Sequence, residues 1–301
     1  MARRLVPIAL LGLAALLVAA PAHATFPGKS GRIAFAQAFT DSEGAPTSGL
    51  SIAAPSRDAE NPPSNRPLLF CDPGALTGCT LSDVRSPSYS ADGRRIVFDG
   101  GERIAIVDAN GRNLRVLSAV TGDDGHPAFS PDGRRIVFTG ENAAGGTDLY
   151  VRRVGGGRAR LVVEDAAEPA WSSRGVLAWV RDRRVHVSAA GGARDRLVTR
   201  GINPDWSPNG RRLVLVRPAG PRRIDGRVHV VRPSGGGLRP VRGVTGSDPV
   251  WSPGGRALAF DILERGVFVK PFGRRGLRIV AESQIGDSGS HTEFHPAWRP
   301  L

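Results

Sequence analysis

The stretch His126-Pro127-Ala128-Phe129-Ser130-Pro131-Asp132-Gly133-Arg134-Arg135-Ile136-Val137-Phe138 decides the fold of this chain, because versions of it recur along the whole sequence. A second well-kept copy runs from Asn203 to Leu215. The prolines that mark the six copies lie 35 to 47 residues apart, at positions 87, 127, 169, 204, 249 and 296. Repeats of this length that are built from short strands are typical of the blades of a β-propeller.

Each copy is predicted to form four strands. The first is the Pro-x-aromatic-Ser segment, and the Asp-Gly that follows supplies the positive φ angles of a tight hairpin. Alternating residues such as Ile136-Val137-Phe138 form the second strand, Leu149-Tyr150-Val151 the third and Arg160-Leu161-Val162-Val163 the fourth. We therefore predict an all-β, six-bladed β-propeller of four-stranded antiparallel blades, in one domain that spans residues 25–301.

The two ends of the chain predict how the ring closes. The last copy, His295-Pro296-Ala297-Trp298, stops at Leu301 without a second strand, whereas the segment from Ser30 to Phe35 matches the second strand of the other copies. The C-terminal strand should therefore join the N-terminal blade, which protects strand edges.

One aromatic residue occupies the same phase of every copy. These rings could form a platform for stacking sugars or could pack between neighbouring blades, and the identical phase favours packing. The series is Tyr89, Phe129, Trp171, Trp206, Trp251 and Trp298.

The N-terminus has the pattern of a secretory signal peptide. Arg3 and Arg4 precede an apolar run from Leu5 to Ala20, and Ala22-His23-Ala24 forms a cleavage site. The run is short for an uncleaved membrane anchor, which is the alternative. We expect residues 1–24 to be removed and the protein to be secreted, with periplasmic and extracellular locations both open.

An exported protein with two nearby cysteines is expected to join them, so we predict a disulfide between Cys71 and Cys79. They lie within an extended loop region predicted over residues 39–80 of the first blade. That region is either a recognition loop or a tolerated insertion.

The chain is strongly basic, with a net charge of +13, and Lys29 and Lys270 are its only lysines. The arginines recur at one repeat position, as in Arg94-Arg95 and Arg134-Arg135. We interpret most of them as solvated hairpin residues of a monomer. The alternative is a surface for an anionic partner such as an anionic glycan, while a nucleic-acid partner is not expected.

The repeated Pro-x-Trp-Ser-Pro-Asp-Gly pattern, seen at His126–Phe138 and Asn203–Leu215, resembles the WD-like repeat of the TolB family of propellers. The resemblance covers nearly all of the chain after residue 24. It implies a six-bladed propeller and, from the envelope role of TolB, a protein that binds other proteins. Related propellers also precede peptidase domains or form sugar-acid lyases. The repeats begin soon after residue 24, so the α/β domain that precedes the TolB propeller is expected to be missing, and no Gly-x-Ser-x-Gly nucleophile motif occurs.

Six residues stand directly before the marker prolines and should form one ring around the channel, because first strands line the channel of a propeller. They are Ser86, His126, Glu168, Asn203, Asp248 and His295. This ring could bind a small polar ligand, and His126, Glu168, Asp248 and His295 could bind a divalent metal ion. The other interpretation is a polar channel that holds only water.

Two classes of function follow. The leading hypothesis is an exported, non-catalytic binding or scaffold protein that holds an envelope or secreted protein through a propeller face. Its support is the TolB resemblance and the lack of a recognised catalytic motif. The alternative is a metal-assisted lyase or hydrolase that acts on anionic glycans at the central channel.

Overall fold

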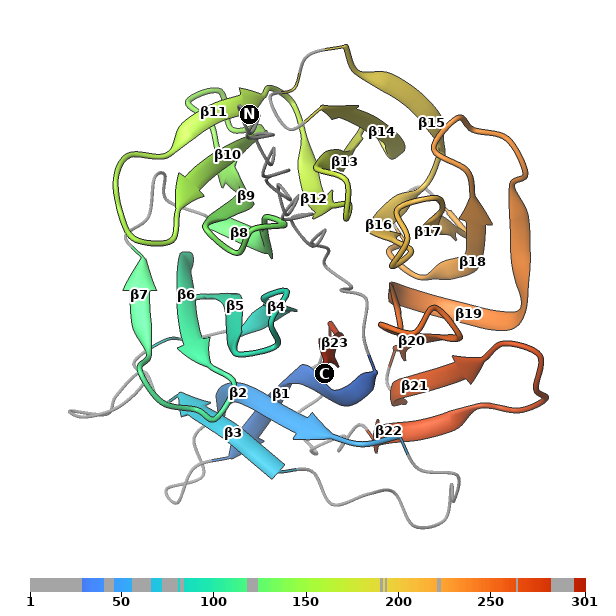
Figure 1. Ribbon diagram of the computed structural model, residues 1–301, viewed down its shortest axis with the longest axis horizontal. Coiled ribbons are helices and arrows are strands. Elements are labelled where there is room, and N and C mark those ends of the chain that lie inside the picture. Colours follow the sequence, from blue (N-terminus) through green and yellow to red (C-terminus); the bar gives the residue numbers. More distant parts are fainter. Residues whose placement is uncertain are drawn as a thin grey trace, which may run out of the picture.

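A computed structural model describes residues 29–40, 46–55, 66–71, 81, 84–117, 124–189, 192, 194–220, 223–263, 265–282 and 295–301. Its strands form antiparallel sheets arranged around a central channel (Figure 1). Four sheets have four strands each, and a seven-stranded sheet joins two further blades through one long shared strand. The predicted six-bladed, all-β propeller is therefore confirmed.

Each blade runs outward from the strand nearest the channel. The first blade consists of β23 (Ala297–Pro300), β1 (Ser30–Thr40), β2 (Pro46–Ala53) and β3 (Arg66–Cys71). The second consists of β4 (Arg85–Tyr89), β5 (Arg95–Gly100), β6 (Arg103–Asp108) and β7 (Arg115–Leu117). The third consists of β8 (Asp124–Phe129), β9 (Arg135–Glu141), β10 (Thr147–Arg153) and β11 (Arg160–Val163).

The other three blades follow in chain order, and the last two of them share one long strand. The fourth blade consists of β12 (Ala167–Trp171), β13 (Val176–Arg181), β14 (Arg184–Ala189) and β15 (Arg196–Arg200). The fifth consists of β16 (Ile202–Trp206), β17 (Leu213–Pro218), β18 (Gly226–Val231) and the first half of β19 (Arg239–Trp251). The sixth consists of the second half of β19, β20 (Ala257–Ile262), β21 (Gly266–Pro271) and β22 (Arg278–Glu282).

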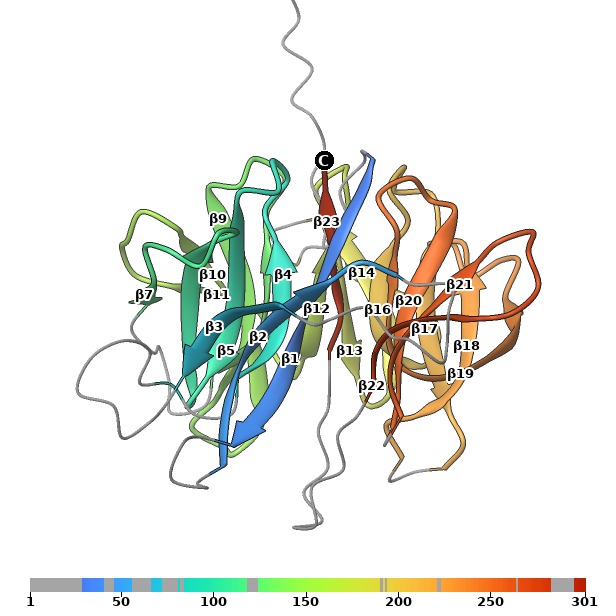
Figure 2. The ribbon, with the colours of Figure 1, turned by 90° about the horizontal axis from the view of Figure 1, so that it is seen from below.

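The ring closes as the two chain ends predict. The C-terminal strand β23 pairs antiparallel with β1, with Ile33 opposite Trp298. The indole N–H of Trp298 donates to the carbonyl of Gly31 at 3.0 Å. The backbone N–H groups of Lys29 and Leu301 each donate to the carbonyl of the other, at 3.1 and 3.0 Å. One blade is thus built from both ends of the chain (Figure 2).

Two strands lie within the extended region predicted over residues 39–80. Strand β2 pairs with β1 from Ile33–Ala53 to Thr40–Pro46, and β3 pairs with β2. The propeller needs third and fourth strands here, and the apolar residues Leu50 and Ile52 face the core. The predicted Cys71–Cys79 disulfide lies outside the described residues, because neither the Cys71 side chain nor residue 79 is described.

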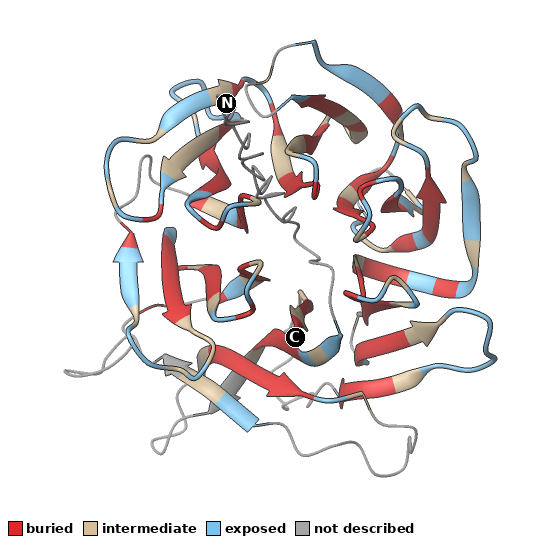
Figure 3. Cartoon of the chain, in the orientation of Figure 1, coloured by how far each residue is buried: buried red, intermediate tan, exposed pale blue. Residues whose placement is uncertain are grey.

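The core lies between the blades. Every aromatic residue of the repeated series is at most 5% exposed, which confirms that the rings pack rather than form an open platform. Buried positions gather on the inner strands and exposed positions on the outer ones (Figure 3). Over the described ranges, no helix has the length and apolar character needed to cross a membrane.

Candidate functional site

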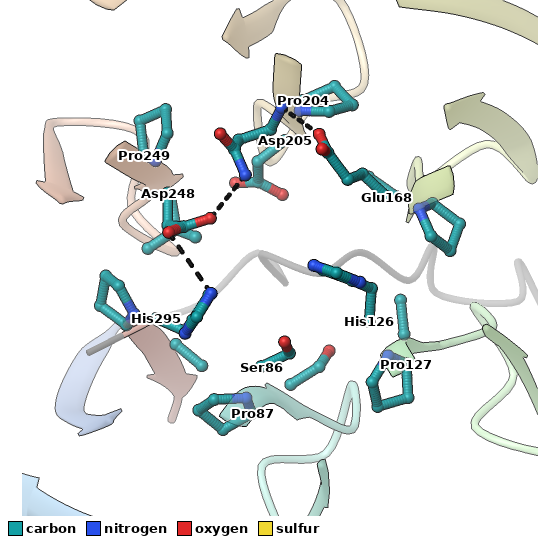
Figure 4. Close-up of a pocket in the computed structure, with 18 residues that line it drawn as sticks. Ser86, Pro87, His126, Pro127, Glu168, Pro204, Asp205, Asp248, Pro249 and His295 are labelled. Atoms are coloured by element: carbon teal, nitrogen blue, oxygen red, sulfur yellow. Dashed lines mark hydrogen bonds and ion pairs between the residues drawn. The ribbon is translucent and has the colours of Figure 1, made fainter. Parts of the chain in front are cut away.

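All six residues of the predicted ring line one cavity of about 110 Å³ in the central channel (Figure 4). The six marker prolines line the same cavity and form its apolar wall. Each ring residue comes from a different blade, just before or within the innermost strand. The structure therefore places all six residues of the predicted ring around one cavity.

A local break in the strand pairing turns these side chains toward the channel. In the second blade, Arg85 pairs with Asp99 and Ser88 with Val97, so one extra residue lies between the two pairs on β4. Four other first strands show the same shift at the same place. Proline has no N–H to donate to a ladder, so it is tolerated at such a bulge.

The backbone of every ring residue is left-handed. Their φ angles lie between 32° for His295 and 52° for Glu168. Residues other than glycine rarely adopt this conformation, and such positions are typical of sites where a side chain must be aimed. Six strained residues at one level of the channel show that the repeat holds the ring in a set geometry.

Four of the ring side chains are linked in a chain of polar contacts. The backbone N–H of Asn203 donates to Oε2 of Glu168 at 2.5 Å, and Nδ2 of Asn203 donates to Oδ1 of Asp248 at 2.7 Å. The other carboxylate oxygen of Asp248 lies 3.6 Å from Nε2 of His295. Glu168, Asn203, Asp248 and His295 thus connect four successive blades, and we call them the channel network.

The remaining two ring residues lie beside the channel network. The imidazole of His126 is exposed to the channel and lies edge-on to that of His295, with 6.4 Å between ring centroids. Ser86 is half-buried and lines the cavity between the two histidines (Figure 4).

Burial in the channel favours the neutral form of Glu168. Removal of the carboxylate from water raises the pKa of Glu168 above its usual value of 4.5, and nearby Asp248 raises it further. His126, the Asn203 N–H and Arg183 act in the opposite direction, but burial is the largest effect. Glu168 therefore retains its proton to a higher pH than an exposed glutamate.

The described residues do not gather the four predicted metal ligands into one cluster. Within the described part of the chain, no group of three or more His, Cys, Asp or Glu side chains is placed to hold one ion. His126, Glu168, Asp248 and His295 are spread around the channel rather than gathered at one point. What the ring does offer is two carboxyl groups, an amide and two imidazoles that can exchange hydrogen bonds with a polar ligand.

Sequence reasoning missed Asp205, which also lines the cavity. It is 3% exposed, and its Oδ2 accepts a hydrogen bond at 2.9 Å from the backbone N–H of Trp251 in the next blade. The other copies have Ser, Ala or Val after the marker proline, so an aspartate in this slot was the available signal.

Comparison with known proteins agrees with the propeller fold. Residues 80–255 match the family model described as the TolB beta propeller domain. No curated protein sequence matches the chain.

Several solved structures share the fold. TolB from Acinetobacter baumannii superposes with a TM-score of 0.64 at 20% identity, over 90% of this chain and 67% of that one. A structure described as putative TolB from Agrobacterium tumefaciens gives 0.60 at 14% identity, over 90% and 100% of the two chains. An oligogalacturonate lyase in complex with manganese gives 0.51 at 14% identity, over 86% and 87%. Because the family model covers more than half of the sequence, this chain belongs to the TolB β-propeller family.

Proposed function

We propose that this protein is an exported, non-catalytic binding protein that holds a segment of a partner protein at its central channel. The single observation that supports this is the channel network, in which polar side chains from four blades are already joined before any ligand arrives. Side chains that are fixed in this way lose little conformational entropy on binding, which favours recognition.

The shape of the site limits what can enter it. A cavity of about 110 Å³ accommodates a side chain or a chain end, not a folded domain. A partner would therefore insert a narrow segment and place the rest of its contacts on the surrounding rim. Among the groups that would meet it, Oδ1 of Asn203 is buried and has no hydrogen-bond partner within the described residues.

The chemistry of the ring favours a donor-rich segment. Oδ1 of Asn203 is a buried acceptor without a hydrogen-bond partner among the described residues, and leaving such an acceptor unpaired is costly. The carboxyl groups of Glu168 and Asp248, which already accept hydrogen bonds within the ring, lie beside it and favour a donor over another acceptor. A backbone amide, an amino group or a guanidinium on the partner would meet this need. The predicted leader over residues 1–24 would deliver the protein to a compartment where envelope or secreted proteins are the available partners.

The test is capture followed by direct binding. Purified protein without residues 1–24 is used to capture partners from envelope and culture extracts, and an enriched protein is then produced and titrated by calorimetry. A His126→Ala/His295→Ala variant should bind it at least about tenfold more weakly, a loss of about 1.4 kcal/mol. An Arg103→Ala/Arg227→Ala variant, altered at two exposed positions on third strands, is the matched control.

Three outcomes would contradict the proposal. One is equal affinity of the channel variant and the wild type for the captured protein. Another is the absence of any protein enriched over a control propeller. The third is metal-dependent cleavage of an anionic glycan by the wild type that the channel variant loses, because that would make the channel a catalytic site.

A further inference from the structure

The topology of the blades gathers the recurring arginines at one end of the propeller. In an antiparallel four-stranded blade, the hairpin between the first two strands and the loop between the last two lie at the same end. Backbone hydrogen bonds confirm this, because Ala109 donates to the carbonyl of Arg94 at 2.7 Å and Val154 to that of Arg134 at 2.9 Å. The C-terminus lies at this end too, opposite the end where the first strands begin (Figure 2).

Exposed arginines mark this end in five successive blades. They are the hairpin residues Arg94, Arg134, Arg174, Arg211 and Arg256. We call this end of the molecule, formed by the first hairpins and the loops between third and fourth strands, the arginine face. From the sequence, each of these arginines is interpreted as a solvated hairpin residue. The circular arrangement of the blades places them together at one end of the molecule.

Two acidic side chains on this face accept hydrogen bonds within its hairpin turns. Oδ1 of Asp92 accepts from the Ser90 hydroxyl at 2.6 Å and from the Arg94 N–H at 3.0 Å. Asp132 makes the same two contacts in the next blade, at 2.5 and 3.0 Å. These carboxylates also lie near arginines of the same hairpins and line the grooves of this face. Six arginines line those grooves against three aspartates, so the face keeps an excess of positive charge that attracts an anion.

Two grooves on this face share Arg95 as a lining residue, and we call the two together the track. One, of about 480 Å³, is lined by Arg299, Arg94 and Arg95, and the next, of about 580 Å³, by Arg95, Arg134 and Arg153 among others. Arg95 belongs to both grooves and is held in place. Its Nη2 donates to the Gly133 carbonyl at 3.0 Å, and its guanidinium lies 5.5 Å from the centre of the Phe129 ring.

We propose that this track binds a linear acidic polysaccharide. A chain that carries regularly spaced carboxylate or sulfate groups could contact guanidinium groups in both grooves at once, and arginine pairs with such anions through two parallel hydrogen bonds. Several weak contacts along one chain then add to a useful affinity.

Other polyanions fit the track less well. Single-stranded nucleic acid binds where bases stack on aromatic rings, but Tyr89, Phe129 and Trp171 are at most 1% exposed. Membrane surfaces are held by inserted apolar side chains as well as by charge. Among the described side chains that line the two grooves, only Ala109 and Val154 are apolar, and Val154 is 5% exposed.

The experiment titrates the full protein, without residues 1–24, with alginate and with heparin, and uses dextran as the neutral control. We expect binding to both acidic chains that weakens as salt rises, and none to dextran. An Arg94→Gln/Arg134→Gln/Arg153→Gln variant should bind about tenfold more weakly. The matched control is Arg103→Gln/Arg200→Gln/Arg227→Gln, which removes the same charge from three exposed positions. Arg103 and Arg227 lie where third strands begin and Arg200 where a fourth strand ends, so all three are away from the arginine face.

Several results would overturn the proposal. Equal losses in the two triple variants would mean that only net charge matters. Tighter binding to a single-stranded DNA oligonucleotide or to phosphatidylglycerol vesicles than to either glycan would assign the face to another partner. The His126→Ala/His295→Ala variant should bind alginate as the wild type does, so failure here is distinguishable from failure of the channel proposal. Circular dichroism and thermal unfolding confirm that each variant folds.

Discussion

Oε2 of Glu168 accepts a hydrogen bond from the backbone N–H of Asn203 at 2.5 Å, which ties the first strands of two successive blades together inside the channel. Each of these residues is the ring residue of its own repeat. The contact therefore joins two different sheets and is separate from the strand pairing within each sheet. It shows that the ring is part of the propeller's structure as well as a candidate binding site.

The pKa of Glu168 predicts how this contact depends on pH. Because the folded-state pKa is raised above 4.5, the native state holds a proton that the unfolded chain releases, so the free energy of unfolding should fall as pH rises above about 4.5. Glu168→Gln keeps an acceptor without the charge and should show a flatter profile. Denaturant unfolding at a series of pH values tests this, with the exposed Glu141→Gln as control. A Glu168→Gln profile as steep as that of the wild type would refute it.

The left-handed backbone at the ring makes it sensitive to the residue type. Ser86 has a φ of 47°, and glycine adopts this angle without strain, whereas a β-branched residue does not. We expect Ser86→Val to lower the free energy of unfolding by about 1–2 kcal/mol and Ser86→Gly to change it little. Urea denaturation measures both, and similar losses in the two variants would argue against backbone strain.

Two tryptophans at the same repeat position offer a matched comparison of a buried hydrogen bond. The indole N–H of Trp206 donates to the Ala170 carbonyl at 3.2 Å, while that of Trp171 has no hydrogen-bond partner among the described residues. Trp206→Phe should therefore cost about 1 kcal/mol more than Trp171→Phe. Equal losses in denaturant unfolding would show that the hydrogen bond adds nothing beyond packing.

Ring closure should depend on the C-terminal strand. Deleting residues 297–301 removes β23 and opens the edge of β1, so we expect a lower melting temperature and aggregation. A circular permutant that links Leu301 to Lys29 and opens the chain at Gly156 should remain folded, because the native ends are hydrogen-bonded to each other. Calorimetry compares the three proteins. A stable truncated form would show that closure is dispensable.

The repeat made much of the fold predictable. A marker proline, an aromatic residue and an Asp-Gly turn at one spacing identify the strands, because each depends only on neighbouring residues. The same phase located the six ring residues. It did not locate the strands β2 and β3, because residues 46–53 and 66–71 carry no marker motif and form strands through the pairing of β2 with β1 and of β3 with β2.

The sequence by itself determined the number of blades, the closing strand and the ring of pre-proline residues, since all three follow from local patterns repeated at a regular interval. Only the tertiary structure decided which ring residues meet, as in the link from Glu168 through Asn203 to Asp248. It also decided that arginines some 40 residues apart share one face. The physical reason is that ring closure brings together side chains that are distant in sequence, and no local pattern records the distances between them.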